Sequence, residues 1–136
     1  MARRLILDTG AVLAYVRQDE EVVAAIEEAR SHLAEVVVPP AVVTEAIRGG
    51  GRDAGVHRLL KASYTSWVGK KLACEAGALI GATDGPSPGV ADAQVVAEAV
   101  RTGNSTILTS DPEDLTVLAG RYAGRRVRIV ALTALH

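Results

Sequence analysis

Phenylalanine is absent from this chain of 136 residues, and aromatic residues make up only 3% of it. The interior must therefore be built from aliphatic side chains, and few rings remain on which a nucleic-acid base could stack. The single cysteine, Cys74, excludes an internal disulfide and a zinc site with several cysteines. It lies in the apolar stretch KLACEAGALI, where we expect a small buried side chain.

Neither sign of charge is in large excess, since the chain has 15 Lys and Arg and 16 Asp and Glu, for a net charge of −1. A polyanionic partner would have to be bound by a local basic patch or through a metal. No apolar run approaches the length of a membrane span, and no signal peptide opens the chain. We therefore expect a cytoplasmic protein with no membrane partner, folded as a single domain over residues 1–136.

The apolar pattern alternates between strands and helices along the whole chain. Short continuous apolar runs predict strands over 3–8, 35–40, 105–110 and 126–132. Helical patterns cover 11–17, 19–33, 41–51, 52–67, 68–81, 91–103 and 112–123, and a loop covers 82–90. Continuous apolar strands between helices are typical of a parallel sheet covered on both faces. The sequence thus predicts a three-layer α/β/α sandwich with a short, mainly parallel sheet of four or five strands.

Two acidic residues, Asp8 and Asp111, directly follow apolar runs. In parallel α/β sheets, ligands lie beyond the carboxyl ends of the strands, where both acids would be. Each also has a purely local explanation. Asp8 or Thr9 would cap the following helix, and Asp111 would cap a helix that starts at Pro112, with Asp114 three residues on.

Two further acids lie in apolar helical segments. Asp92 falls in the first turn of the helix GVADAQVVAEAV, where the helix dipole would stabilise a carboxylate on the surface. Glu45 lies in the short helix PPAVVTEAIRGG, where it would ordinarily face solvent. Each local explanation is adequate alone, but together they must account for acids embedded in apolar surroundings at strand ends and helix starts.

The segments around these acids resemble the signature blocks of PIN-domain ribonucleases, in the same order along the chain. They are LILDTGAVLAYV, VVPPAVVTEAIRGG, VADAQVVAEAV and ILTSDPEDL. The resemblance runs from the first strand to the last, and the chain is most similar to VapC-type toxins of type II toxin–antitoxin pairs. It implies a PIN-like fold and a catalytic set of acids that binds Mg²⁺ or Mn²⁺. The catalytic set would be Asp8, Glu45, Asp92 and Asp111, with Asp8, Asp92 and Asp111 as metal ligands and Glu45 and Asp114 as further possible ligands.

The sequence departs from the family pattern at Gly10, where a hydroxyl residue often stands two places after the first acid. Thr9, Thr109 and Ser110 are the remaining candidates for a supporting hydroxyl. Asp114 could share or replace the role of Asp111, whereas the loop acid Asp84 is placed outside the site.

Oxygen ligands of this kind suit Mg²⁺ or Mn²⁺, which would activate water and neutralise the phosphate. Without metal, clustered carboxylates would repel one another and share at least one proton. Arg48 and Arg52 are the basic residues expected to contact RNA phosphate. The histidines at 32, 57 and 136 are expected to be surface or structural residues.

The resemblance implies a metal-dependent endoribonuclease acting on tRNA, mRNA or rRNA, and it implies a homodimer and a cognate antitoxin as partners. The alternative is a PIN-like binding module without turnover. A phosphoacceptor of the receiver type is excluded, because ILDTG has a single acid and RIVALTALH has no Lys. Tyr64 and Trp67, placed three apart on a helix, would form an exposed patch or lie in the core, and we expect the core.

Overall fold

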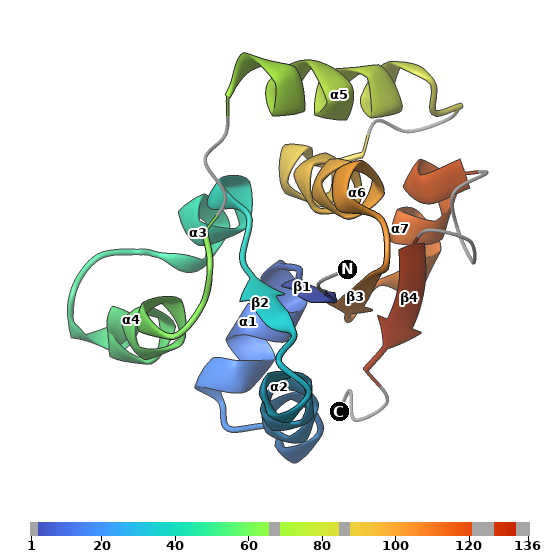
Figure 1. The fold of residues 1–136 in the computed structure, drawn as a ribbon. Helices are drawn as coiled ribbons and strands as arrows, with labels where there is room; N and C mark the ends of the chain where they lie inside the picture. The colour runs from blue at the N-terminus through green and yellow to red at the C-terminus, as the bar shows by residue number, and fades with distance from the viewer. Residues whose placement is uncertain (1–2, 66–68, 85–87, 121–126, 133–136) are drawn as a thin grey trace.

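A parallel sheet forms the centre of the molecule (Figure 1). The structure is a computed structural model that describes residues 3–65, 69–84, 88–120 and 127–132. All strand pairs are parallel, and the strand order is β2-β1-β3-β4. The strands are β1 (Arg4–Leu7), β2 (Glu35–Val37), β3 (Ser105–Thr109) and β4 (Val127–Ala131).

Helices cover both faces of the sheet (Figure 1). The chain moves from β1 to β2 in one direction and from β2 to β3 and β4 in the other, so right-handed crossovers place the connecting helices on opposite faces. On one face lie α1 (Thr9–Val16) and α2 (Glu20–Ser31). On the other lie α6 (Val90–Thr102) and α7 (Pro112–Ala119), with α5 (Lys70–Gly81) packed outside α6.

Two shorter helices complete the described chain beside the sheet. α3 (Pro40–Ala46) packs against α1 and α6, and α4 (Ala54–Lys61) packs against α1 after a 3₁₀ turn at Gly51–Asp53. The predicted three-layer α/β/α sandwich is thereby confirmed, and the described part of the chain contributes four strands to its sheet. No helix within the described ranges is long and apolar enough to cross a membrane.

The core is aliphatic, as the lack of phenylalanine requires. Ile6 of β1 and Ile107 of β3 are fully buried. Val95, Val96 and Ala99 of α6 face the same core.

The predicted helix over 41–51 is too long, because α3 ends at Ala46. Ile47 is extended with a ψ of 132°, and Gly49 and Gly50 have φ of 89° and 88°, which glycine adopts without strain. The glycines therefore belong to a loop after the helix rather than to its last turn.

The predicted helix over 52–67 is also too long, and the expected place of Tyr64 is wrong. α4 ends at Lys61, and Tyr64 forms a parallel bridge with Val37, where it is 42% exposed. The bridge extends the pairing of β2 and takes Tyr64 out of the helix. Trp67 lies outside the described residues.

Cys74 is exposed, so its expected burial is wrong. α5 packs on α6 through Leu72 and Ala76, each two residues from Cys74. Since two residues correspond to more than half a helical turn, Cys74 lies on the outer side of α5. His32 and His57 are exposed, in agreement with the sequence analysis, and His136 lies outside the described residues.

Candidate active site

Asp8 is the first acid of the candidate site, and it follows β1 as predicted. It is buried and caps α1, with Oδ1 accepting a hydrogen bond of 2.8 Å from the Ala11 N–H. Oδ2 accepts a hydrogen bond of 2.5 Å from the Thr109 hydroxyl. Burial raises the pKa of Asp8, and the hydrogen bonds from Thr109 and Ala11 oppose this. The cap explanation and the strand-end position therefore both hold for this residue.

Thr109 joins the ends of β1 and β3. Its side chain is fully buried, and its Oγ1, besides donating to Asp8, accepts a hydrogen bond of 2.7 Å from the Asp111 N–H. One hydroxyl thus fixes the carboxylate of the first acid and the backbone of the last.

Asp111 caps α7, in which Pro112 is the first residue, as the sequence predicted. Its carboxylate accepts a long hydrogen bond of 3.5 Å from the Asp114 N–H. A side-chain hydrogen bond with Asp111, together with the negative charge of Asp111, raises the pKa of the Asp114 carboxyl. The two acids therefore form a pair at the surface.

Glu45 reaches the site from α3. Its side chain is exposed, and Oε1 accepts a hydrogen bond of 2.5 Å from the Thr9 hydroxyl, which comes from the first turn of α1. The start of α3 is held by α6, since the Ala41 N–H donates to Oε1 of Gln94 at 3.1 Å. The sequence analysis did not identify Gln94, and its place two residues after Asp92 is the only local signal.

Asp92 lies in the first turn of α6 and is half-buried. Its pKa is raised to about 6, first by burial and then by the negative charges of neighbouring carboxylates. Those neighbours are Asp8, Asp111, Asp114 and Glu45. The residues that the sequence predicted as a set thus interact electrostatically through Asp92. We call Asp8, Glu45, Asp92, Asp111 and Asp114 the acidic cluster.

The acidic cluster is suited to a divalent cation by the chemistry of its donors. Every donor is a carboxylate oxygen, the ligand type that Mg²⁺ and Mn²⁺ prefer, and a cation would relieve the repulsion that raises the pKa of Asp92. In the part of the chain that the structure describes, no group of three or more Asp, Glu, His or Cys is arranged to hold a metal directly. Mg²⁺ usually keeps several water ligands, so a few direct carboxylate contacts suffice for it.

The loop after α3 carries both arginines that were predicted to contact RNA. The Arg48 guanidinium donates to the carbonyls of Thr44 and Ile47 at 3.2 and 2.8 Å, so it caps the end of α3. Arg52 is exposed, in the 3₁₀ turn. Of the two arginines, Arg52 is therefore the better placed to contact a ligand.

Asp53 holds this loop in shape, a role that the sequence analysis missed. Its buried carboxylate accepts hydrogen bonds from the backbone N–H groups of Arg48 and Gly49, at 3.1 and 2.6 Å. The hydrogen bond from Arg48 is the main cause that lowers the pKa of Asp53. Its position directly before α4 was a signal for a cap, but the carboxylate binds the preceding loop instead.

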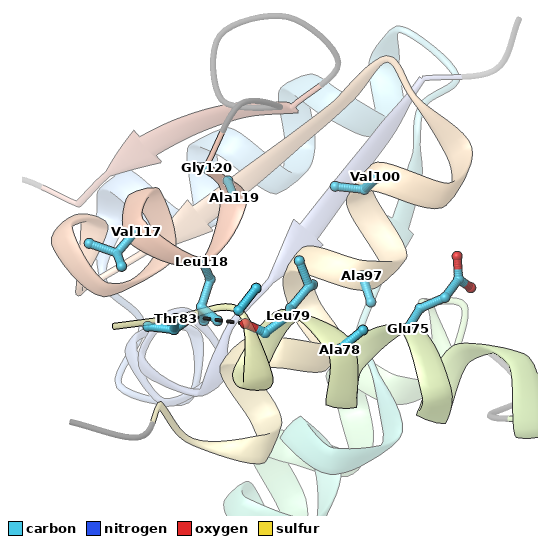
Figure 2. Close-up of a pocket in the computed structure, with 11 residues that line it drawn as sticks. Glu75, Ala78, Leu79, Thr83, Ala97, Val100, Val117, Leu118, Ala119 and Gly120 are labelled. Carbon is cyan, nitrogen blue, oxygen red and sulfur yellow. Dashed lines mark hydrogen bonds between the residues drawn. The ribbon is translucent and has the colours of Figure 1, made fainter. Parts of the chain in front are cut away.

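A hollow of about 420 Å³ lies between α5, α6 and α7 (Figure 2). Leu79, Ala97 and Leu118 line it together with other small or apolar residues and the polar Glu75 and Thr83. Val117, which also lines it, is 61% exposed. None of the acidic cluster lines this hollow, so it is not the site of the carboxylate chemistry.

Comparison with known proteins finds a likeness in structure but not in sequence. Neither a protein-family model nor a curated protein matches the sequence. A chain in the crystal structure of VapBC2 from Rickettsia felis, bound to a DNA fragment from their promoter, is similar with a TM-score of 0.74. The similarity covers 96% of this chain and 99% of that chain at 12% identity, so it concerns the fold. The chain therefore has a PIN-like α/β/α sandwich fold.

Proposed function

We propose that the chain is a metal-dependent endoribonuclease and the toxin of a type II toxin–antitoxin pair. The observation that carries the proposal is the pKa of Asp92, raised to about 6 by burial and by the four other carboxylates of the acidic cluster. Strongly perturbed carboxylates that converge from separate elements are characteristic of functional sites. The PIN-like fold, similar to a chain of VapBC2, supports the same conclusion.

In this proposal Asp8, Asp92 and Asp111 hold Mg²⁺ or Mn²⁺, and Glu45 and Asp114 add to the negative charge around the cation. When bound, the cation would neutralise the scissile phosphate and activate water. The chain itself keeps the carboxylates in place, since Thr109 holds Asp8 and Thr9 holds Glu45. Because Asp92 carries a proton below a pH of about 6, cation binding would strengthen as the pH rises above that value.

RNA is the proposed substrate, and its recognition would depend on the cation and a few arginines. The net charge of −1 offers no general attraction to a polyanion. Arg52, and more weakly Arg48, would contact phosphate from the loop after α3. Activity on tRNA, mRNA or rRNA would place the protein in the cytoplasm.

A cognate antitoxin is the proposed protein partner, and the toxin would be a homodimer. The structural neighbour belongs to a VapBC2 complex, which supports an antitoxin partner for a chain of the same fold. An antitoxin arginine that reaches the acidic cluster would neutralise the charge that the cation otherwise neutralises, and would thereby inhibit cleavage.

A binding module without turnover is the competing function. Binding without turnover does not require a carboxylate such as Asp92, whose burial next to other acids disfavours its charged form. The acidic cluster therefore favours the nuclease.

Cleavage of RNA by the purified chain, free of any partner, tests the proposal. Labelled tRNA and an unstructured RNA are incubated with Mg²⁺, Mn²⁺ or EDTA, with Asp92→Asn and Asp84→Asn as variants. We expect cleavage only with metal, loss of cleavage in Asp92→Asn, and wild-type cleavage in Asp84→Asn, which changes an exposed acid outside the acidic cluster. Cleavage that persists in EDTA or in Asp92→Asn would reject the proposed site. Intact RNA under every condition would favour the binding module.

A further inference from the structure

Gly10 lies at a point of α1 where the structure leaves no room for a side chain. A Cβ atom at this position would lie 2.8 Å from Cβ of Ser110 and closer still to its Oγ. Real Cβ atoms do not approach other heavy atoms this closely, so one of the two residues would have to move. The φ angle of Gly10 is not in the left-handed region. Position 10 therefore requires glycine because the Ser110 side chain fills the space above it.

That space adjoins the carboxylate of Asp8. The position of a Cβ on Gly10 is 3.6 Å from Oδ1 of Asp8, so the Ser110 side chain lies beside this acid. The backbone N–H of Ser110 also acts on Asp8, where it lowers the pKa of the carboxyl. Ser110 lies between Thr109 and Asp111, which are joined by a hydrogen bond from the Asp111 N–H to the Thr109 hydroxyl.

Three hydroxyl groups surround the acidic cluster, and they differ in what they bind. The hydroxyl of Thr9 donates to Glu45, and that of Thr109 donates to Asp8 and accepts from Asp111. Within the described ranges, the hydroxyl of Ser110 makes no hydrogen bond, although the residue is only partly exposed. Of the three hydroxyls, it is therefore the one whose proton is not already donated to a protein group.

We propose that Ser110 supplies the ligand-contacting hydroxyl of the acidic cluster, from the space that a side chain at residue 10 would otherwise fill. This inference rests on the proposed function, because the ligand oxygen would belong to water bound to the divalent cation. The hydroxyl comes from the residue that follows β3, and Gly10 leaves the space that it occupies. If Ser110 only filled space, its Cβ alone would be enough.

Moving the hydroxyl between the two positions tests the inference. Ser110→Ala keeps the Cβ that fills the space and removes only the hydroxyl, so we expect a wild-type Tm and a kcat about tenfold lower, the size of one lost hydrogen bond. The double variant Gly10→Ser/Ser110→Gly places a hydroxyl in the same space from α1, and we expect it to recover to within about threefold of the wild type. Gly10→Ala/Ser110→Gly is its matched control, without a hydroxyl, and should remain as slow as Ser110→Ala. A wild-type kcat in Ser110→Ala, or equal recovery in both double variants, would overturn the inference.

Mn²⁺ affinity gives a second readout that does not need cleavage. We expect Ser110→Ala to bind Mn²⁺ several-fold more weakly, with recovery only in Gly10→Ser/Ser110→Gly. If the wild-type chain cleaves no RNA, the proposed function fails, and the order of these affinities still decides the role of the hydroxyl. Equal Mn²⁺ affinities in all variants of such a chain would reject it.

Discussion

At the scale of single residues, the candidate site depends on one buried hydroxyl. Thr109 donates to the Asp8 carboxylate and accepts from the Asp111 N–H, so two strand ends are joined by a single side chain. The carboxylates of Glu45 and Asp111 are exposed, whereas Asp8 is buried. The position of Asp8 is thus set by the interior of the protein, and the other acids are arranged around it.

Replacing Thr109 with Val distinguishes the effect of the hydroxyl from that of the volume of the side chain. Valine keeps the shape, but Asp8 loses a donor and the Asp111 N–H loses its acceptor, so we expect a loss of about 1–3 kcal/mol in unfolding free energy. Metal-dependent cleavage should fall by about 10- to 100-fold, as for other residues that orient metal ligands. Urea unfolding and kcat/KM measure the two effects. Thr109→Ser, which keeps the hydroxyl, is the control and should stay close to the wild type, whereas equal effects of Val and Ser would contradict the role.

The pKa of Asp92 predicts how stability depends on pH in the absence of metal. Because the pKa rises from 3.8 to about 6 on folding, Asp92 takes up a proton at a higher pH in the folded chain than in the unfolded chain as the pH falls. The contribution of Asp92 is therefore most favourable below pH 3.8 and is lost as the pH rises through 6. Asp92→Asn, which cannot ionise, should be more stable than the wild type at pH 7.5, and the difference should shrink toward pH 4.5.

Urea unfolding of both proteins in EDTA at several pH values measures this difference. Asp92→Asn also removes a negative charge that repels Asp8 and Asp114, so their carboxyls ionise more easily in the variant and add to the difference in the same direction. Parallel pH profiles for the wild type and Asp92→Asn would show that Asp92 ionises normally.

At the scale of helices and strands, Arg4 ties the sheet to α6. Its guanidinium lies 2.7 Å from the carboxylate of Glu98, which is fully buried, and 2.9 Å from that of Glu35. The guanidinium also lies over the ring of Tyr64, 5.5 Å from its centroid. A buried carboxylate of this kind is costly when its partner is removed.

Replacing Arg4 with Met should therefore destabilise the fold. Arg101 still lies 2.8 Å from Glu98, so we expect a loss of about 3 kcal/mol, at the low end for a broken buried pair. Arg3→Met is the matched control at an exposed neighbouring position, with an expected effect within about 0.5 kcal/mol. Equal urea midpoints for the two variants would show that the ion pair contributes nothing.

Most elements could be predicted from the sequence, because their apolar patterns are continuous and their ends carry clear signals. The prolines and caps indicated correctly where α3 and α7 begin. Each predicted strand matches an observed strand to within a few residues at its ends. The ends of α3 and α4 could not be predicted. Long-range contacts set them, through the Asp53 carboxylate bound to the loop and the bridge from Tyr64 to Val37.

The site was predictable only in part. The strand-end rule alone pointed to Asp8 and Asp111, whereas Glu45 and Asp92 were identified by resemblance to a family. The hydrogen bond from Thr109 to Asp8 joins residues 101 positions apart, and no local pattern encodes it. The same holds for the packing of Ser110 over Gly10, which depends on the pairing of β1 with β3.

At the scale of the whole molecule, the strand order creates the candidate site. β1 and β3 are neighbours at the centre of the sheet, so Asp8 and Asp111 emerge at the same edge. α3 and α6 pack against each other and bring Glu45 and Asp92 to it, with Gln94 joining the two helices. Acids from four separate elements thus interact around Asp92, which is the arrangement that a divalent cation would stabilise.

Titration of the protein with Mn²⁺ at pH 7.5, followed by calorimetry, tests this account most directly. The wild type should bind the cation, and Asp92→Asn should bind it at least tenfold more weakly, because it loses the carboxylate at the centre of the acidic cluster. Asp84→Asn should match the wild type, since Asp84 is an exposed loop acid that does not act on Asp92. Equal affinity in the wild type and Asp92→Asn would contradict the central claim that the acidic cluster is a metal site.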